Sequence, residues 1–215
     1  MSSGKFITFE GLDGSGKTTQ VERLATALRA AGRDVVVTRE PGGTPIGEQI
    51  RAVLLDARTH GLAARAEMAL MFASRAQQIH EVIKPALREG KIVLCDRFTD
   101  SSEAYQGFGR QLGSDTILEM HRVVCQDFHP DLTLLFVGDV RSDLERARTR
   151  NSKDDDRESR FERERSDFFE RVARGYEAIA KRETKRVAII DAKHAIDEVH
   201  ASVMRAVKER LPQLL

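Results

Sequence analysis

The hydrophobic residues of the chain form short apolar runs that alternate with longer segments of helical periodicity. Most of the short runs are apolar at consecutive positions, which is typical of strands covered on both faces in a parallel sheet. The runs expected to be strands cover residues 6–10, 34–38, 92–96, 132–137 and 186–191. The segments expected to be helices lie near 17–31, 45–57, 66–89, 114–126, 141–149, 160–182 and 195–210.

Strands that alternate with helices predict the fold class, a three-layer α/β fold with a five-stranded parallel sheet and helices on both faces. Gly32 and Gly90 stand where helices are expected to end, and Pro45 where one begins. The 215 residues can bury a proper core and contain no internal repeat or low-complexity linker. We therefore expect a single domain over residues 1–215, with ligands at the carboxyl ends of the strands.

Composition narrows the range of partners. Lysine and arginine total 35 against 34 aspartate and glutamate residues, and the lack of a basic excess argues against nucleic-acid binding. No run approaches 18 apolar residues, so no membrane span is expected. Cys95 and Cys125 are isolated, which favours reduced thiols in the cytoplasm over a disulfide framework. The six histidines show no metal-ligand spacing, and we expect no metal site from them.

Residues 11–18, with the sequence GLDGSGKT, match the phosphate-binding pattern G-x-x-x-x-G-K-[ST] between an expected strand and an expected helix. Glycines let successive backbone N–H groups turn toward phosphates, and the helix N-terminus adds its partial positive charge. Lys17 is expected to reach the β- and γ-phosphates of a nucleoside triphosphate, and the Thr18 hydroxyl to coordinate Mg²⁺. The predicted ATP-binding residues are Gly11, Leu12, Asp13, Gly14, Ser15, Gly16, Lys17 and Thr18.

Asp96 and Arg97 end the third expected strand and start the loop after it. A carboxylate at this place is where a P-loop protein orients its metal or metal-bound water, so Asp96 is a second predicted metal ligand. Arg97 can face an anionic substrate from there. The alternative is a surface salt bridge.

A phosphate-binding loop alone does not separate a kinase from a hydrolase. The N-K-x-D sequence of GTPases occurs nowhere in the chain. Transfer between two nucleotides needs several cations to hold both sets of phosphates in line, and arginines are available for this purpose. This favours a nucleotide kinase over two alternatives: a small P-loop kinase for another substrate, and a P-loop regulatory or nucleic-acid-binding module. The arginines are Arg39, Arg75, Arg97, Arg148, Arg150 and Arg160.

Arginine, aspartate and glutamate dominate the segment 146–165. This composition fits a solvated, salt-bridged helix pair with a loop at 151–156. It also fits a mobile, arginine-bearing flap.

Five segments in sequence order carry a resemblance to the thymidylate kinase family: FEG at 9–11, TREPGGT at 38–44, DRF at 96–98, SSEAYQG at 101–107 and DFHPDLT at 127–133. The resemblance implies a P-loop nucleoside monophosphate kinase fold. It also implies a cytoplasmic enzyme that phosphorylates dTMP to dTDP with ATP and Mg²⁺, in dTTP biosynthesis for DNA synthesis. A homodimer packed through the helix near 66–89 is implied as well.

The resemblance also implies roles for residues around dTMP. Two arginines would hold its phosphate, and Asp13 would lie near the sugar 3′-OH. Tyr105 would lie against the sugar 2′ carbon and leave no space for a ribose hydroxyl. In many members the phenylalanine that stacks on the base is one position earlier, where this chain has Met71. The implied substrate-binding residues are Asp13, Arg39, Phe72, Arg75, Arg97, Ser102, Tyr105 and Gln106.

Catalytic arginines distinguish two types within the family. Some members carry an arginine inside the P-loop, where this chain has Gly14. Members without it, like this chain, supply arginines from the flap, which favours the flap interpretation of residues 146–165. The flap here lacks the usual aspartate before Arg160 and has an acidic insert at 154–156. The implied catalytic residues are Lys17, Arg97, Arg148 and Arg150.

Overall fold

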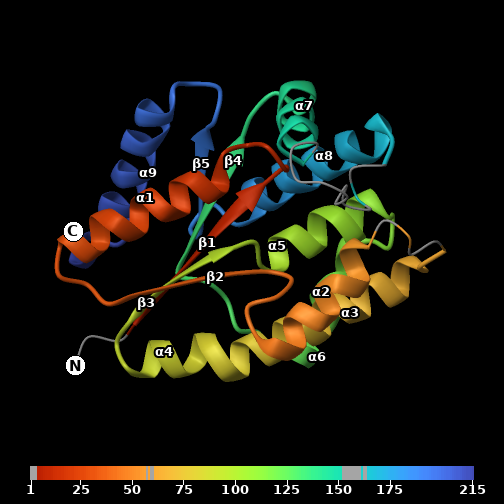
Figure 1. The fold of residues 1–215 in the computed structure, drawn as a ribbon, viewed down its shortest axis with the longest axis horizontal. Helices are drawn as coiled ribbons and strands as arrows, with labels where there is room; N and C mark the ends of the chain where they lie inside the picture. The colour runs from red at the N-terminus through yellow and green to blue at the C-terminus, as the bar shows by residue number, and fades with distance from the viewer. Residues whose placement is uncertain (1–3, 57, 59–60, 152–160, 162–163) are drawn as a thin grey trace.

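Five parallel strands form one sheet at the centre of the computed structural model, which describes residues 4–56, 58, 61–151, 161 and 164–215. The order across the sheet is β2-β3-β1-β4-β5 (Figure 1). The predicted sheet is therefore confirmed, with all five of its strands. Their bounds are β1 Lys5–Gly11, β2 Val35–Arg39, β3 Ile92–Asp96, β4 Leu132–Val137 and β5 Val187–Asp191.

The register of three neighbouring strands aligns their carboxyl ends. Phe9 of β1 is paired with Asp96 of β3, and Asp96 is paired in turn with Arg39 of β2. The loop after β1, the residue after β3 and the last residue of β2 therefore leave the sheet at one edge. This is the edge at which parallel α/β sheets bind their ligands.

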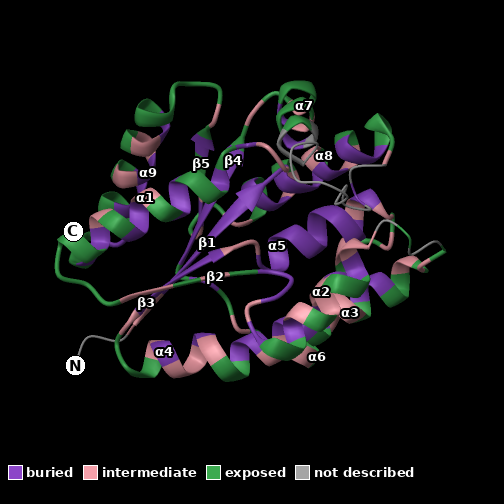
Figure 2. Cartoon of the chain, in the orientation of Figure 1, coloured by how far each residue is buried: buried purple, intermediate pink, exposed green. Residues whose placement is uncertain are grey.

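One face of the sheet is covered by helices α1 (Lys17–Ala30) and α9 (Ile196–Arg210). Successive residues of a strand point to opposite faces, and Ile7 and Phe9 pack in one apolar cluster with Leu24 of α1 and Val203 of α9. Figure 2 shows the result: the central strands are mostly buried, whereas the helices are exposed on their outer sides.

The opposite face is covered by helices that follow β2, β3 and β4 in the chain. Helices α3 (Ala64–Gln78) and α6 (Ser114–Cys125) pack with Phe6 of β1. Helix α8 (Ser166–Arg182) packs with Leu135 of β4. With helices on both faces, the predicted three-layer arrangement is confirmed.

The helix expected near 66–89 consists of three segments. Helix α3 ends at Gln78, a π-helical turn η1 spans Ile79–Ile83, and α4 spans Lys84–Arg88. Pro85 lies in the first turn of α4. Because proline has no N–H and its ring clashes with the carbonyl four residues earlier, a regular helix cannot continue through it. The wider π turn lies at the point of that misfit.

The sequence predicts no helix between β3 and α6, yet this segment is helical. Helix α5 spans Thr99–Ser102 and continues into a second π-helical segment, η2, over Glu103–Gly109. A Cβ on Gly109 would lie 2.6 Å from the Phe168 ring. The glycine therefore permits the close approach of η2 to α8, which positions α5 beside the β1 loop.

The remaining helices are α2 (Pro45–Leu55), α7 (Val140–Asn151) and the short η4 (Pro212–Leu214). Thr44 caps α2 by accepting the Gly47 N–H at 2.9 Å, so Pro45 begins a helix as predicted. Within the described part of the chain, no helix has the length and apolar character needed to cross a membrane.

Candidate active site

Glycine residues shape the loop between β1 and α1. Gly11, Gly14 and Gly16 have positive φ angles of 134°, 81° and 89°, a region that other residues rarely adopt. Gly16 is the N-cap of α1 and has no side chain to accept from the first helical amides. Those amides therefore face the position at a helix N-terminus where anions bind.

The Lys17 side chain folds back over this loop. Its Nζ donates to the Leu12 carbonyl at 2.7 Å and to the Gly11 carbonyl at 3.1 Å, and the residue is 5% exposed. Burial, assisted by the positive charge of Arg97, lowers the pKa of the Lys17 ammonium to about 8. The group is therefore still mostly protonated at neutral pH, as binding to phosphate oxygens requires.

Helix α7 contacts the loop at Gly14. A Cβ on Gly14 would lie 1.9 Å from the Asp143 carbonyl oxygen, so α7 leaves no space for a side chain at this position. The Arg146 Nε donates to the Gly14 carbonyl at 3.0 Å. Helix α7 thus begins against the predicted ATP-binding loop and continues through positions 148 and 150.

Much of the rest of the predicted flap, residues 152–160 and 162–163, is outside the structural description. The side chains of Arg148 and Arg150 lie outside the described residues, as do Arg160 and the acidic positions 154–156. Their predicted roles stay predictions.

Thr18 and Asp96, the two predicted metal ligands, lie side by side. The Thr18 Oγ1 donates to the Asp96 Oδ2 at 3.0 Å, across the carboxyl ends of β1 and β3. A hydroxyl and a carboxylate are oxygen ligands of the kind that Mg²⁺ prefers. The pair also lies one residue from Lys17, so the residues present fit a Mg²⁺ ion that accompanies a phosphate chain.

Arg97 connects the β1 loop to the elements that follow β3 and β4. One guanidinium nitrogen donates to the Asp13 Oδ1 at 2.7 Å. Another donates to the Ser101 Oγ at 2.9 Å and to the Tyr176 hydroxyl at 3.2 Å. The Arg97 backbone has φ 74°, a strained value for a residue other than glycine. Strain of this kind persists only where surrounding contacts hold it, and it clusters at functional sites.

Glu10 is a site residue that the sequence analysis did not single out for chemistry. Its carboxylate accepts from the Phe98 N–H at 2.7 Å, from the Ser101 hydroxyl and from the Tyr176 hydroxyl at 3.2 Å. Ser101 and Tyr176 are the same groups that Arg97 contacts. Glu10, the second-last residue of β1, therefore holds in place two groups that also contact Arg97.

The environment of Glu10 makes folding depend on pH. Burial, followed by the negative charge of Asp100, raises the pKa of Glu10 from 4.5 to about 7. Between those values the folded protein keeps a proton that the unfolded chain has lost. The free energy of unfolding should therefore fall as pH rises from about 4.5 to about 7, and this fall should level off above the folded pKa.

We predict that Glu10→Gln removes this part of the pH dependence, because glutamine does not titrate. Relative to the parent, the variant should gain on the order of 1–3 kcal/mol in unfolding free energy between pH 5 and 7.5. Urea titrations at several pH values measure the difference. Glu119→Gln is the control, because that carboxylate is 67% exposed. Parallel stability curves for the parent and Glu10→Gln would contradict the prediction.

Arg75 is buried in a separate polar group beneath the same edge. Its Nε pairs with the Glu40 Oε2 at 2.7 Å, and one terminal nitrogen donates to the Ser102 Oγ at 2.9 Å and the Phe98 carbonyl at 3.0 Å. Within the described residues, its other terminal nitrogen has no hydrogen-bond partner, although the residue is only 2% exposed. The Arg75 guanidinium lies 4.7 Å from the centre of the Phe72 ring, which is itself buried. A buried N–H without an acceptor costs folding free energy. This nitrogen is therefore a candidate donor to a ligand.

Arg39 is exposed and paired, and it has a neighbour that the sequence analysis missed. Both Glu48 oxygens accept from Arg39 at 3.0 Å. The missed neighbour is Arg51. Burial lowers the pKa of the Arg51 guanidinium, and the nearby charges of Arg39 and Arg97 lower it further. Its own donor bond goes to the Pro41 carbonyl at 2.8 Å. Arg39, Arg51 and Arg97 are therefore near enough to interact electrostatically, with the Glu48 and Asp13 carboxylates among them. Arg51 lies within helix α2 and belongs to no sequence motif, so the sequence gave no reason to single it out.

Tyr105 and Gln106 differ in their relation to this group. The Tyr105 hydroxyl lies 3.4 Å from both Asp13 and the Arg97 guanidinium, and its ring meets the Phe161 ring edge-on. The Gln106 amide nitrogen instead donates to the buried Glu67 at 2.7 Å. Tyr105 is thus part of the Arg97 group, whereas Gln106 is held by a carboxylate of α3.

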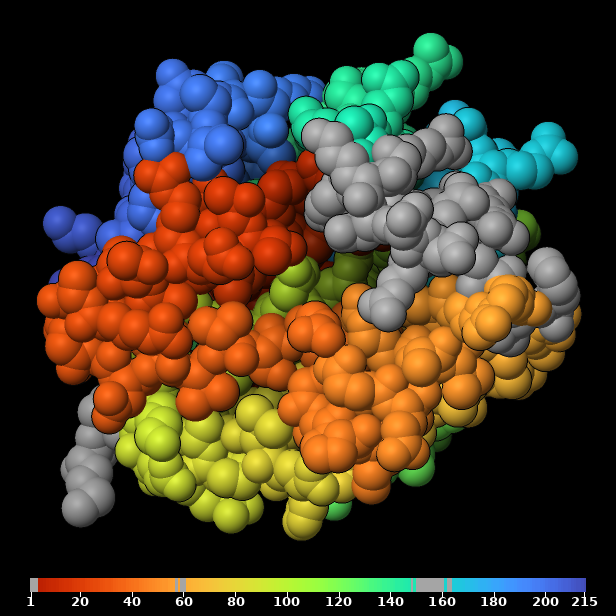
Figure 3. Space-filling model, viewed as in Figure 1, coloured from red at the N-terminus to blue at the C-terminus, as the bar shows by residue number. Residues whose placement is uncertain are grey.

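The surface of the molecule is hollowed beside helices α1 and α2. Figure 3 shows the hollow between the red residues that include α1 and the orange residues that include α2, with yellow-green atoms of the α5 region at its floor. The P-loop, the Thr18–Asp96 pair and an arginine group converge on one sheet edge, which defines a P-loop phosphotransferase of the nucleoside monophosphate kinase type. The family model for thymidylate kinase matches residues 9–203. The chain belongs to the thymidylate kinase family.

Individual relatives agree over nearly the whole chain. Thymidylate kinase of Geobacter sulfurreducens is 48% identical over 211 residues, which cover 98% of this chain and 99% of that protein. Thymidylate kinase of Desulfovibrio desulfuricans is 49% identical over 208 residues, or 96% of each chain. The crystal structure of thymidylate kinase from Ehrlichia chaffeensis has a TM-score of 0.76 at 35% identity and covers 96% of this chain and 99% of that chain.

Proposed function

We propose that this protein transfers the γ-phosphoryl group of ATP to dTMP and forms dTDP, on the route to dTTP for DNA synthesis. The observation that carries the proposal is the pairing of Arg97 with Asp13. An arginine suited to the acceptor phosphate is held directly against the loop suited to the donor. Two phosphate groups bound on either side of this pair would be close and in line, which is most of what phosphoryl transfer requires of a protein.

ATP binds in the loop 11–18 with its phosphates on the first amides of α1. Thr18 and Asp96 would hold Mg²⁺, which would supply positive charge to the phosphate oxygens. Lys17 exchanges its bonds to the Gly11 and Leu12 carbonyls for bonds to the β- and γ-phosphates. The acceptor oxygen itself attacks the phosphorus atom, so no protein nucleophile takes part.

The acceptor phosphate binds to Arg97, Arg39 and Arg51. A phosphate dianion suits guanidinium groups, which donate two bonds in one plane. Binding requires Arg39 to turn from Glu48, and the exposure of both side chains makes that exchange inexpensive.

The thymine base binds beside Arg75, with Ser102 next to it. The terminal nitrogen of Arg75 that has no partner among the described residues would donate to a base carbonyl. Phe72 contributes apolar surface below the base, and Gln106 would have to release Glu67 to reach it. Tyr105 packs against the sugar. Asp13 is near enough to Tyr105 to accept from the sugar 3′-OH in the same pocket.

We predict a defined order of acceptors. Rejection of a ribose hydroxyl is steric, because a close-packed ring cannot admit an added oxygen without strain. Loss of the thymine methyl costs only about 1–3 kcal/mol. Therefore dTMP should exceed dUMP modestly, and both should exceed UMP, CMP and AMP by much more. A coupled ADP-release assay with saturating ATP measures kcat/KM for all five acceptors.

Two variants sharpen that assay. Tyr105→Ala should narrow the gap between dUMP and UMP, whereas Tyr105→Phe keeps the ring and should preserve it. If AMP, CMP or UMP were the best acceptor, the assignment of dTMP would be wrong and a different P-loop kinase activity would remain. ADP release that is independent of any acceptor would indicate the regulatory ATPase alternative.

We also propose a homodimer, a single domain over residues 1–215 with a flap at about 146–165, and a cytoplasmic location. Helices α2 and α6 both pack on α3. They expose Ile46 and Val53 on α2 and Val123 on α6, an apolar surface that a second copy would cover. Cys95 and Cys125 are both free and buried, in keeping with a reducing compartment.

A further inference from the structure

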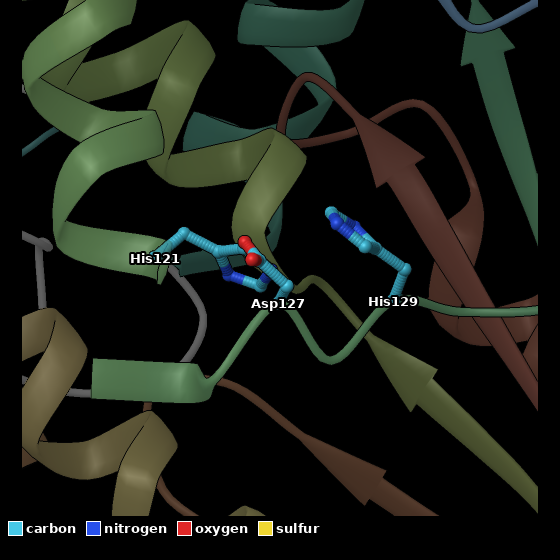
Figure 4. A group of neighbouring side chains, drawn as sticks. All are labelled: His121, Asp127 and His129. Carbon is cyan, nitrogen blue, oxygen red and sulfur yellow. The ribbon is translucent and has the colours of Figure 1, made fainter. Parts of the chain in front are cut away.

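Two histidines and an aspartate gather at the end of α6 and in the loop that leads to β4. Imidazole nitrogens of His121 and His129 and a carboxylate oxygen of Asp127 all lie within 4.8 Å of one another. The two rings are 4.7 Å apart between their centres. Figure 4 shows the Asp127 carboxylate in front of the His121 ring, with the His129 ring turned toward both. The spacing H-x₅-D-x-H matches no pattern by which sequence alone would suggest a metal site, so the sequence analysis did not single out this group.

His121 is the anchoring member of this cluster. The residue is 1% exposed, and its Nδ1 lies 2.9 Å from the Thr99 hydroxyl. Its Nε2 is buried and has no hydrogen-bond partner among the residues that the structure describes. A buried polar atom without a partner calls for an explanation. A bound cation would supply the missing interaction.

The chemistry of the three side chains selects the kind of cation. Imidazole suits zinc and similar transition metals, whereas Mg²⁺ and Ca²⁺ prefer oxygen ligands. The buried Nε2 of His121, which has no hydrogen-bond partner among the described residues, is the ring nitrogen available to such a metal. The Thr99 hydroxyl bonded to the other ring nitrogen fixes the ring, as groups behind metal-binding histidines commonly do.

We propose that His121, Asp127 and His129 form an accessory site for a divalent transition metal, of which Zn²⁺ is the best match. Nitrogen and oxygen ligands around tetrahedral zinc lie about 3.4 Å apart, since each bond is about 2.0–2.1 Å. The exposed Asp127 and His129 side chains close that gap by rotating toward the fixed His121. Water completes the fourth position.

The site would act on the fold rather than on the chemistry. It would join the end of α6 to the loop before β4, and through Thr99 to the first residue of α5. Zn²⁺ should therefore raise the melting temperature of the full-length protein without any nucleotide.

The test is a titration of the full-length protein with Zn²⁺ by calorimetry, in excess Mg²⁺ so that Thr18 and Asp96 do not compete for zinc. We expect one Zn²⁺ per chain, and a visible absorption spectrum of tetrahedral type when Co²⁺ is used instead. His129→Ala and Asp127→Asn alter exposed residues and should keep the fold, yet each should weaken binding by at least about 10-fold, the smallest effect usual even for groups behind the ligands.

Two further variants distinguish a specific metal site from weak, non-specific binding of zinc at the surface. His194 contacts Asp191 and Glu198 at 3.4 and 3.6 Å, without a second imidazole, so His194→Ala should bind Zn²⁺ as the parent does. Thr99→Val removes the group behind His121 and should weaken binding by about 10–100-fold. Unchanged binding in His129→Ala, or no binding by the parent, would overturn the proposal. Unchanged binding in Thr99→Val would overturn the role assigned to His121.

Discussion

Replacing Lys17 with alanine is expected to abolish phosphoryl transfer while the protein stays folded. The ammonium is the one cation of the described loop that can reach the transferring group. It donates to the Gly11 and Leu12 carbonyls and, at 3.5 Å, to the Ser15 hydroxyl. Removing a preorganised donor to developing charge typically costs about 10²–10³ in kcat. Because a buried charge is removed together with its hydrogen bonds, the effect on unfolding should be small by comparison.

The measurement is kcat with saturating ATP and dTMP, beside a thermal melt of the same preparation. Lys208→Ala, an exposed lysine on α9, is the control and should match the parent in both. The Lys17→Ala variant could instead melt like the parent and keep more than about a tenth of its rate, a loss below 1.4 kcal/mol. That result would contradict the assignment of residues 11–18 as the phosphate-binding loop.

A still larger effect is expected from Arg148→Ala combined with Arg150→Ala. The loop has no arginine of its own, and the contact between Gly14 and Asp143 leaves no space for one. We therefore expect the arginine charge on the transferring group to come from α7, which already contacts the loop through Arg146. An arginine in this role is worth about 10³–10⁵ in turnover, so the double variant should lose at least that much in kcat with little change in KM for dTMP.

Arg141→Ala is the matched control, because Arg141 is an exposed arginine of the same helix. Steady-state rates over a range of dTMP separate the two parameters. If the double variant kept its kcat, the segment 146–165 would return to the interpretation as a solvated, salt-bridged helix pair.

The strands were predictable because their apolar runs reflect burial on both faces, and the bounds of β3 and β4 agree with the sequence prediction to the residue. The two π-helical segments were not. A π turn is wider than an α turn but has no residue motif of its own, so the sequence of 66–89 gave no sign of it. In η2 the packing of Gly109 on Phe168 decides the backbone, and that contact joins positions 59 residues apart.

The site residues also divide into those that the sequence predicted and those that it did not. The loop 11–18 could be predicted because its chemistry depends on residues that are neighbours in sequence. Glu10, Tyr176 and Arg51 were missed as site residues because their roles come from contacts across the fold, such as the shared bonds of Glu10 and Arg97 to Ser101. Nor could sequence show that Arg39 would pair with Glu48, or that Gln106 would bind Glu67.

The left-handed backbone at Arg97 has a consequence for how this protein can change over generations. Glycine would relieve the conformation at φ 74° by about 1 kcal/mol or more. Selection for thermal robustness alone would therefore favour glycine at position 97. The same change would remove the guanidinium that contacts Asp13, Ser101 and Tyr176. A substitution that relaxes the backbone at position 97 would therefore also break the contacts that join the β1 loop to α5 and α8.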